Sequence, residues 1–317
     1  MNFRIEPVRF STINSENRTF QITTDRKISA LQRSVREIGL ITPPILFDSG
    51  TDLIIISGFR RIQVCRNLDW LKTEFRILPS AAPPFRLAQI AIAENSFQRE
   101  LNLIELSRAY GLLHEAQKDA AAVQRAASAL NLPSTPAFME KVRPLARLPE
   151  AIQQGILSET VPLPMALELA EMEAEEGTRV AELFTALNPS LNKQREMLGL
   201  AKEIAAREDL SVWEVFQAPP VQKVLSNADL DRNQKIFRLR RHLKHRRFPN
   251  LSRAEDQFQE VVKTMKLGAG IQLNPPPFFE GSDYHLSLRF SRLSELEAGR
   301  GAIDRILQSP EIRHYIS

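Results

Sequence analysis

The hydrophobic pattern changes near Phe85, and this change constrains the fold more than any other feature of the sequence. Before Phe85, helical and strand patterns alternate, as they do in a small α/β domain. From Phe85 to about Pro275 the pattern is almost wholly helical, and a strand pattern returns only after a run of prolines. The sequence therefore predicts an α+β protein, with a small mixed α/β N-terminal domain, a predominantly helical middle and a short strand–helix module at the C-terminus.

Local signals place the elements of the N-terminal domain. Ser29 and Gln32 form a capping-box pattern at a helix start, and Gly39 suits the position after the helix end. The turn-rich segment Asp48–Thr51 separates two apolar runs and predicts a hairpin. The remaining predictions are hairpin strands at residues 45–47 and 53–56, a helix at residues 60–68 and a strand at residues 75–78.

The helical middle begins at a second capping-box pattern, formed by Asn102 and Glu105, and its first helix is predicted to end near Lys118. Short helices at residues 123–130 and about 137–147 are joined by a turn, and this pair indicates a helix-turn-helix. The later predicted elements are helices at residues 165–175, 180–187, 193–207 and 293–307 and a strand at residues 284–290.

Composition limits the classes of protein that the chain can belong to. Its 42 Lys and Arg residues against 38 Asp and Glu give a net charge of +4, which favours nucleic acid only where positive charge is concentrated. No stretch approaches the roughly 18 uncharged apolar residues of a membrane helix, so a cytoplasmic protein without a membrane partner is predicted. Cys65 is the one cysteine, which excludes an internal disulfide, and its place on an apolar helix face predicts a buried structural thiol.

The segment Ile56–Arg61 runs from a predicted strand through a glycine into a helix start. Gly58 would let the backbone approach a ligand closely, and the guanidinium groups of Arg60 and Arg61 suit phosphate oxygens. The structural alternative is a turn with two solvated arginines. A dense polar cluster follows at residues 94–105, and its structural alternative is a capped loop between two helices.

Together these two segments resemble the N-terminal domain of the ParB family of partition proteins, which shares a fold with sulfiredoxin. The family has a Gly-x-Arg-Arg motif after a strand, then a Glu-Asn-x-Gln-Arg motif and a Leu-Asn-Pro-Ile-Glu helix start. Phe59 departs from the family, which usually has a polar or charged residue there, and Ser96-Phe97 contains one extra residue. The matching residues are Gly58, Arg60, Arg61, Glu94, Asn95, Gln98, Arg99, Leu101, Asn102, Ile104 and Glu105.

The resemblance implies a nucleotide site for CTP and Mg²⁺, with Glu94 and Asn95 as metal ligands, since Mg²⁺ prefers oxygen ligands. It identifies no catalytic residue and leaves a slow CTPase activity open. The implied nucleotide-binding residues are Thr42, Gly58, Arg60, Arg61, Glu94, Asn95, Gln98 and Arg99. The predicted domains are a nucleotide-binding domain at residues 1–100, a helix-turn-helix DNA-binding domain at 101–190, a helical region with a basic helix at 191–275 and a C-terminal module at 276–317.

Two regions are candidates for DNA binding. At the predicted helix-turn-helix, polar and cationic side chains could reach phosphates and base edges, and the candidates are Ser134, Thr135, Lys141 and Arg143. Residues 238–247 hold eight basic or potentially basic side chains and no acidic one, which favours contact with a phosphate backbone. The candidates in this helix are Arg240, Lys244 and Arg247, and the alternative is a solvated helix paired with acidic residues elsewhere.

The leading hypothesis is therefore a ParB-like DNA-binding protein for plasmid or chromosome partition, regulated by CTP and Mg²⁺. A strand standing alone near the C-terminus would expose a pairing edge, which favours a homodimer, and the family resemblance adds a partition ATPase as a further partner. The alternatives are a metal-dependent nuclease, in which Glu94 and Mg²⁺ promote phosphodiester hydrolysis, and a DNA-binding regulator without a nucleotide.

Overall fold

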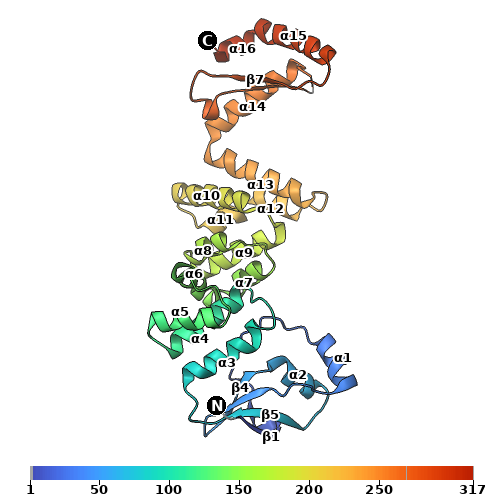
Figure 1. The fold of residues 1–317 in the computed structure, drawn as a ribbon. Coiled ribbons are helices and arrows are strands. Elements are labelled where there is room, and N and C mark those ends of the chain that lie inside the picture. The colour runs from blue at the N-terminus through green and yellow to red at the C-terminus, as the bar shows by residue number, and fades with distance from the viewer. Residues whose placement is uncertain (1–2, 269, 317) are drawn as a thin grey trace. The chain divides into compact units, whose positions relative to one another are not determined.

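The structure is a computed structural model that describes residues 3–268 and 270–316 (Figure 1). It divides into two compact units, called unit 1 (residues 1–185) and unit 2 (residues 186–317). The predicted α+β class is confirmed, because 61% of the chain is helical and a small curled sheet accompanies the helices. The finer domain boundaries predicted from the sequence stay predictions.

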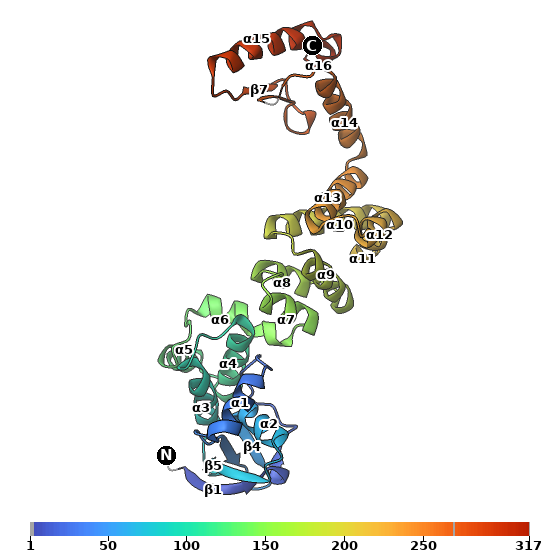
Figure 2. The same ribbon diagram turned by 90° about the vertical axis from the view of Figure 1, so that its right-hand side faces the viewer.

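Unit 1 begins with a five-stranded mixed sheet in the order β1-β5-β3-β4-β2. Strands β1, β4 and β5 of this sheet are labelled in Figure 2. The predicted hairpin is confirmed, since β3 and β4 pair antiparallel with Asp48 opposite Leu53. β5 lies parallel to β3 on its other side and antiparallel to β1. The strands are β1 (Arg4–Arg9), β2 (Ile13–Asn14), β3 (Ile45–Asp48), β4 (Leu53–Ser57) and β5 (Lys72–Leu78), with a 3₁₀ turn η1 (Phe10–Thr12).

Helices cover both faces of this sheet. The alternation of side chains along β4 shows it, because Ile55 packs with Ile62 and Cys65 of α2 whereas Ile56 packs with Leu87 of α3. α1 lies on the same face of the sheet as α2, because its buried side chain packs into the same core cluster. The helices are α1 (Ser29–Ile38), α2 (Phe59–Asn67) and α3 (Pro84–Ser96).

The two predicted capping boxes have different outcomes. Ser29 is the first helical residue of α1, and the N-cap is Ile28, which has no side-chain oxygen to bond the helix start, so the first predicted box is wrong. Gly39 ends that helix with φ of +79°, as predicted. The second box is confirmed, because the Asn102 side chain accepts from the N–H groups of Ile104 and Glu105 and the Glu105 side chain accepts from the N–H of Asn102.

Short helices form the rest of unit 1. The predicted helix at residues 137–147 ends earlier, at Val142, because Pro144 lacks an N–H and its ring clashes with the carbonyl of an α-helical turn. The predicted helix at residues 165–175 is likewise two separate elements. The elements are α4 (Leu103–Ala116), α5 (Ala120–Ala129), α6 (Pro136–Val142), the 3₁₀ helix η2 (Arg143–Arg147), α7 (Glu150–Leu157), α8 (Leu163–Ala170) and α9 (Ala174–Leu187), the last of which crosses the unit boundary.

Unit 2 combines helices with a second, two-stranded sheet. β7 pairs antiparallel with β6, so the prediction of a lone strand is wrong. The sequence pattern missed β6 because it has four residues and lies directly before the prolines. The elements are α10 (Leu191–Glu208), α11 (Val212–Gln217), α12 (Pro219–Ser226), α13 (Arg232–Arg247), α14 (Pro249–Thr264), β6 (Ile271–Asn274), η3 (Pro277–Phe279), β7 (His285–Leu288), α15 (Leu293–Gln308) and α16 (Pro310–Ile316).

Within the described residues, no helix is both long enough and apolar enough to cross a membrane.

Candidate functional site

The junction of β4 and α2 accepts only a glycine at position 58. Gly58 has φ of +93°, a left-handed conformation that side chains disfavour. A Cβ added there would also lie 2.7 Å from the Cβ of Pro44, closer than two carbons can pack. The missing side chain lets the start of α2 approach the segment before β3. No described side chain caps the first N–H groups of α2, and residues 58–61 line a cavity.

This cavity has a volume of about 370 Å³ and is called the cradle below. Its size lies within the range of small-molecule sites in proteins. It is lined from the start of α2, from the end of α3 and from the segments before α1 and β3. All eight residues implied as nucleotide ligands line it, namely Thr42, Gly58, Arg60, Arg61, Glu94, Asn95, Gln98 and Arg99.

Arg61 lies deepest of the cradle's arginines. Its guanidinium is 3.5 Å from the carboxylate of Glu94, and it donates to the carbonyl of Thr42 at 2.9 Å. Burial lowers the pKa of Arg61 below its ordinary value, although the charge of Glu94 opposes this shift. A buried guanidinium with one weak acidic partner would gain from a second anion.

Arg60 lies at the same helix start as Arg61 and has different partners. It pairs with Asp25 at 3.0 Å and donates to the carbonyl of Lys27. Its Nε is buried and has no hydrogen-bond partner among the described residues. A buried donor without a partner is costly, and a phosphate oxygen in the cradle would satisfy it.

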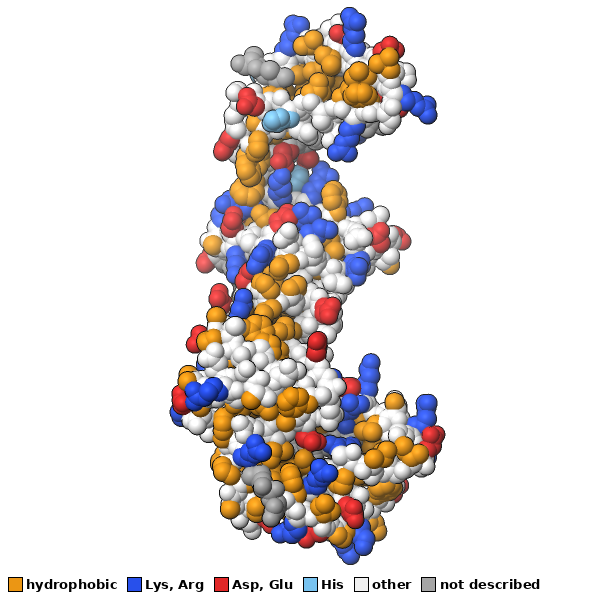
Figure 3. Space-filling view, viewed as in Figure 1, with side chains coloured by type: hydrophobic (Ala, Val, Ile, Leu, Met, Phe, Trp, Pro, Cys, Tyr) orange, Lys and Arg blue, Asp and Glu red, His pale blue; other side chains and the backbone are white. Residues whose placement is uncertain are grey.

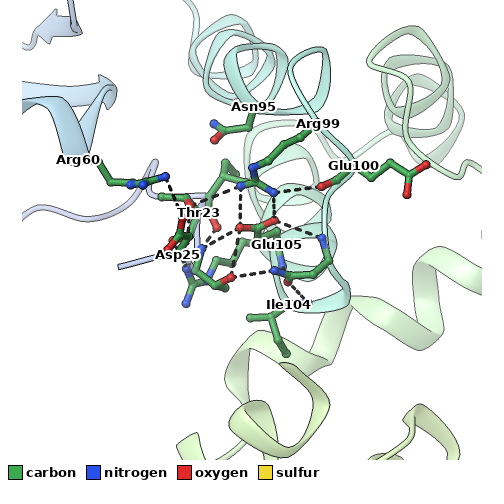
Figure 4. A network of polar contacts seen from close by, with 12 residues as sticks. Thr23, Asp25, Arg60, Asn95, Arg99, Glu100, Ile104 and Glu105 are labelled. Atoms are coloured by element: carbon green, nitrogen blue, oxygen red, sulfur yellow. Dashed lines mark hydrogen bonds and ion pairs between the residues drawn. The ribbon is translucent and has the colours of Figure 1, made fainter. Parts of the chain in front are cut away.

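Arg99 is held by a buried carboxylate. It forms two hydrogen bonds with Glu105, from Nη1 at 2.5 Å and from Nη2 at 2.8 Å (Figure 4). Burial opposes ionisation of Glu105, but hydrogen bonds from Arg99 and from the N–H groups of Thr24 and Asn102 outweigh it, so the pKa of Glu105 lies below its ordinary value. The same contact raises the pKa of Arg99.

Residues 18–27, called the strap, lie between the cradle and α4. Thr24 donates its N–H to Glu105 at 2.8 Å, and the carbonyl of Thr23 accepts from Arg108 at 3.0 Å. Figure 4 shows Thr23 and Asp25 of the strap between Arg60 and Arg99. Asp25 and the strap were not predicted from the sequence, because short polar stretches without periodicity give no structural signal.

The oxygens of Glu94 and Asn95 suit Mg²⁺. Asn95 donates its side-chain N–H to the carbonyl of Ala91 at 2.8 Å, which fixes the amide and leaves its oxygen for a ligand. The described residues contain no group of three or more acidic, His or Cys side chains that could hold a metal ion alone. Mg²⁺ often takes one or two protein ligands and completes its shell with water and substrate phosphates, so the donor set fits a metal that arrives with a nucleotide.

Two other positions in α2 have structural roles. Phe59 is half-buried, packs against the core cluster that includes α2 and also lines the cradle. The fold therefore accommodates a phenylalanine where the family usually has a polar or charged residue. Cys65 is fully buried, and burial raises the pKa of its thiol. The predicted burial of this thiol is confirmed.

The candidates of the predicted helix-turn-helix lie on and beside α6. Thr135 precedes α6, Lys141 lies in its last turn and Arg143 begins η2, and all three are exposed. Ser134 is partly buried in the connection that follows α5. Their exposure is compatible with DNA contact, but a recognition helix of seven residues is short, and base reading stays a prediction.

The basic helix α13 buries its apolar seam of Ile236, Leu239 and Leu243, as predicted. Its three candidate DNA ligands are engaged in ion pairs with neighbouring helices, which matches the geometry of the structural alternative. These pairs join Arg240 to Glu196 (2.6 Å), Lys244 to Glu255 (2.7 Å) and Arg247 to Glu203 (2.5 Å). DNA contact by this helix stays a prediction, and it would require exchange of these partners.

The C-terminal module exposes apolar side chains although its strand is paired. Phe258 centres a buried cluster between α14, the small sheet and α15. Figure 3 shows hydrophobic side chains at the surface of this part of the chain. The exposed residues include Leu286, Phe290, Leu293, Leu296, Ile303 and Leu307.

Known proteins resemble the chain over part of its length. A nucleoid occlusion protein from Listeria monocytogenes serotype 4a is 29% identical over 188 residues, which are 57% of this chain and 63% of that protein. A probable chromosome-partitioning protein ParB from Campylobacter jejuni is 32% identical over 91 residues, or 29% of this chain and 32% of that protein. A probable plasmid-partitioning protein ParB from Thermus thermophilus is 23% identical over 237 residues, or 62% of this chain and 78% of that protein. The chain thus spans less than two thirds of the Listeria relative.

No family model matches the chain. A solved structure of C-terminally truncated ParB from Caulobacter crescentus, complexed with CTP-gamma-S, covers 57% of this chain and 98% of its own, with 19% identity and a TM-score of 0.27. A Pnob8-like ParB-N domain covers 72% of this chain and 94% of its own, with 14% identity and a TM-score of 0.35. Overlaps this low do not transfer a ligand position to this chain.

Proposed function

Because this chain is a ParB-type protein, we propose that it binds DNA in plasmid or chromosome partition and that its cradle binds a nucleoside triphosphate with Mg²⁺. CTP is the proposed nucleotide, on the strength of the family resemblance. Arg60, Arg61 and Arg99 would bind the phosphates, with Glu94 and Asn95 as the metal ligands.

One observation carries the nucleotide proposal. Residues from two short motifs, near position 60 and near position 96, line a single cavity although they are far apart in the sequence. Three guanidinium groups and the N-terminus of a helix there offer the donors that a triphosphate needs. The structural alternative, a turn with two solvated arginines, does not require the two motifs to line one cavity.

The cradle arginines have internal carboxylate partners that a phosphate would replace. Asp25 holds Arg60, and Glu105 holds Arg99. A triphosphate in the cradle would compete for both guanidinium groups and so weaken the attachment of the strap. Because Glu105 lies in the first turn of α4, the same competition would reach the helices that carry the DNA-binding candidates.

DNA binding is supported by the exposed Thr135, Lys141 and Arg143 near α6. A homodimer is supported by the apolar surface of the C-terminal module, since exposed apolar patches often mark protein interfaces. A partition ATPase as a partner rests on the family resemblance alone. Location in the cytoplasm with the DNA follows from the proposed role.

Calorimetry with CTP, ATP, GTP and UTP, each with Mg²⁺, tests the nucleotide proposal. We expect CTP to bind and Mg²⁺ to strengthen its binding, with Glu94→Gln removing the metal effect. Absence of binding by all four nucleotides up to millimolar concentration would instead favour a regulator without a nucleotide.

The nuclease alternative has little support from the geometry. Within the described residues, Glu94 is the one carboxylate that lines the cradle, and Glu100 lines a different cavity. Metal-dependent phosphodiester hydrolysis usually needs several carboxylates around its metal ions. Nicking of supercoiled DNA by the purified chain, lost in Glu94→Ala, would reverse this conclusion.

A further inference from the structure

A second basic cavity lies beside the strap. Its volume is about 500 Å³, and it is bounded by the strap, α4, η2 and α7. The strap forms a wall of both cavities, because Gln21 lines the second cavity, Phe20 and Ile22 line the cradle, and Thr23 lines both. The second cavity is called the arginine cleft below.

Arginines dominate the walls of the arginine cleft. Two come from the strap, one from α4 and two from η2, against two glutamates. They are Arg18, Arg26, Arg108, Arg143 and Arg147. Five guanidinium groups from three separate segments create a positive potential that the two glutamates do not cancel, and potentials of this kind attract polyanions.

The glutamates of the cleft hold their arginines weakly. Glu115 is 3.6 Å from Arg147, and Glu150 is 3.9 Å from Arg26, with all four side chains largely exposed. Exposed pairs at such distances contribute little, because water and salt screen them. Arg18 enters no ion pair in the described part of the chain. The strap therefore offers an unpaired cation at Arg18, and η2 offers a weakly paired one at Arg147.

Arg108 occupies the floor between the strap and α4. Its Nη1 donates to the carbonyls of Ile22 and Thr23, at 3.2 and 3.0 Å, and no hydrogen bond from its Nη2 occurs within the described residues. Burial lowers the pKa of Arg108, and Glu105 opposes this shift. A half-buried guanidinium with donors to spare is suited to an anion that enters the cleft.

We propose that the arginine cleft is a phosphate-binding site separate from the cradle and that it takes the phosphates of a DNA backbone. The DNA source rests on the proposed function. It is favoured because η2, which forms one wall, follows α6 directly and begins with Arg143, a predicted DNA ligand. A free oligophosphate has the same chemistry and is the other source.

The test uses the full chain with Arg18→Ala and Arg147→Ala together, which removes one exposed cation from each wall. Arg33→Ala with Arg36→Ala is the matched control, because both side chains are exposed on α1, line neither cavity and carry the same charge. Affinity for duplexes of unrelated sequence is measured over a range of salt concentrations. Binding of inorganic pyrophosphate without DNA is measured by calorimetry, with the number of sites as the readout.

Two lost phosphate contacts should flatten the plot of log affinity against log salt by roughly 1.8 units, at about 0.9 per contact, and the control should keep the wild-type slope. An unchanged slope with one pyrophosphate site lost would keep the phosphate site and assign it to a free oligophosphate. An unchanged slope with every pyrophosphate site retained would overturn the proposal. A wild-type chain that binds no DNA would count against the proposed function. The pyrophosphate calorimetry alone would then decide whether the arginine cleft is a phosphate-binding site.

Discussion

Glu105 faces Arg99 across the start of α4 and binds it through both carboxylate oxygens, with the carboxylate almost wholly buried. The same side chain accepts from the N–H groups of Thr24 in the strap and Asn102 at the helix cap. One carboxylate therefore fixes a proposed phosphate ligand, the strap and the first turn of α4. This sharing gives the cradle a physical connection to the helical part of unit 1.

The first prediction concerns the acid stability of this contact. The pKa of Glu105 is lower in the folded protein than its ordinary value of 4.5. The Glu105 carboxylate therefore binds a proton less readily in the folded state than in the unfolded state. Its stabilisation is fully present above pH of about 4.5 and is lost as the pH falls through the folded pKa.

Glu105→Gln should be less stable than wild type at neutral pH, and the difference should shrink below pH of about 4.5. We expect less than the roughly 3–5 kcal/mol of a fully buried pair, because the Arg99 side chain remains 41% exposed. Urea unfolding at several pH values measures this. A difference that stays constant from neutral to acid pH would show that the ion pair does not stabilise the fold.

The second prediction concerns the two arginines at the start of α2. Arg60→Ala and Arg61→Ala should each weaken nucleotide binding while the fold is kept, because each removes a charge-assisted contact of about 1.5–3 kcal/mol. Arg60 should lie at the lower end, since its release from Asp25 offsets part of the gain. Calorimetry measures the affinities, with Arg33→Ala as the control. Wild-type affinity in both variants would remove the cradle as the nucleotide site.

The third prediction concerns the two reasons for glycine at position 58, which are its positive φ and the close approach of Pro44. Gly50 also has positive φ, at +89°, but an added Cβ would meet nothing within 4 Å, whereas at Gly58 it would meet Pro44. Gly50→Ala should therefore cost about 1–2 kcal/mol of unfolding free energy from backbone strain alone. Gly58→Ala should cost more and should also narrow the cradle.

Thermal or urea unfolding of both variants gives the two costs, and calorimetry gives nucleotide affinity. Equal destabilisation by the two substitutions would mean that the contact with Pro44 relaxes freely. In that case the close approach would not be what requires glycine at position 58.

The sequence predicted the cradle better than it predicted its surroundings. Gly58, Arg60 and Arg61 belong to a short motif whose strand–glycine–helix context is local, so residue types alone indicate the site. The partners Asp25 and Glu105 depend on tertiary packing of the strap. Asp25 lies 35 positions before Arg60, and Thr24 lies 81 positions before Glu105. Contacts between segments this far apart leave no periodic signal in one sequence.

Element types were also easier to predict than their ends and pairings. The hairpin and the helix of Cys65 follow from apolar runs with clear punctuation. β6 was missed because a four-residue strand before prolines resembles a loop, and the end of α6 was misplaced because Pro144 permits a 3₁₀ continuation but no α-helical one. The ion pairs of α13 could not be predicted, since the acidic partners lie on other helices.

The fourth prediction concerns the basic helix α13 and uses two matched triple variants. If Arg240, Lys244 and Arg247 contact DNA phosphates, replacing all three by Ala should flatten the salt dependence of DNA affinity by close to three units, at roughly 0.9 per contact. The matched variant replaces their carboxylate partners and consists of Glu196→Gln, Glu203→Gln and Glu255→Gln. It should bind DNA more tightly than wild type, because it frees the three cations and removes three charges that repel phosphate.

If α13 only packs against its neighbours, different results are expected for both variants. Ion pairs that only join α13 to its neighbours would lower the melting temperature when either side is replaced, and the salt slope would not change. Because both variants break the same pairs, any shared loss of stability cancels in the comparison, and the difference in DNA affinity reports on phosphate contact alone. An equal salt slope in the two variants and in wild type would remove α13 from the DNA-binding surface and leave its cations a role in packing unit 2.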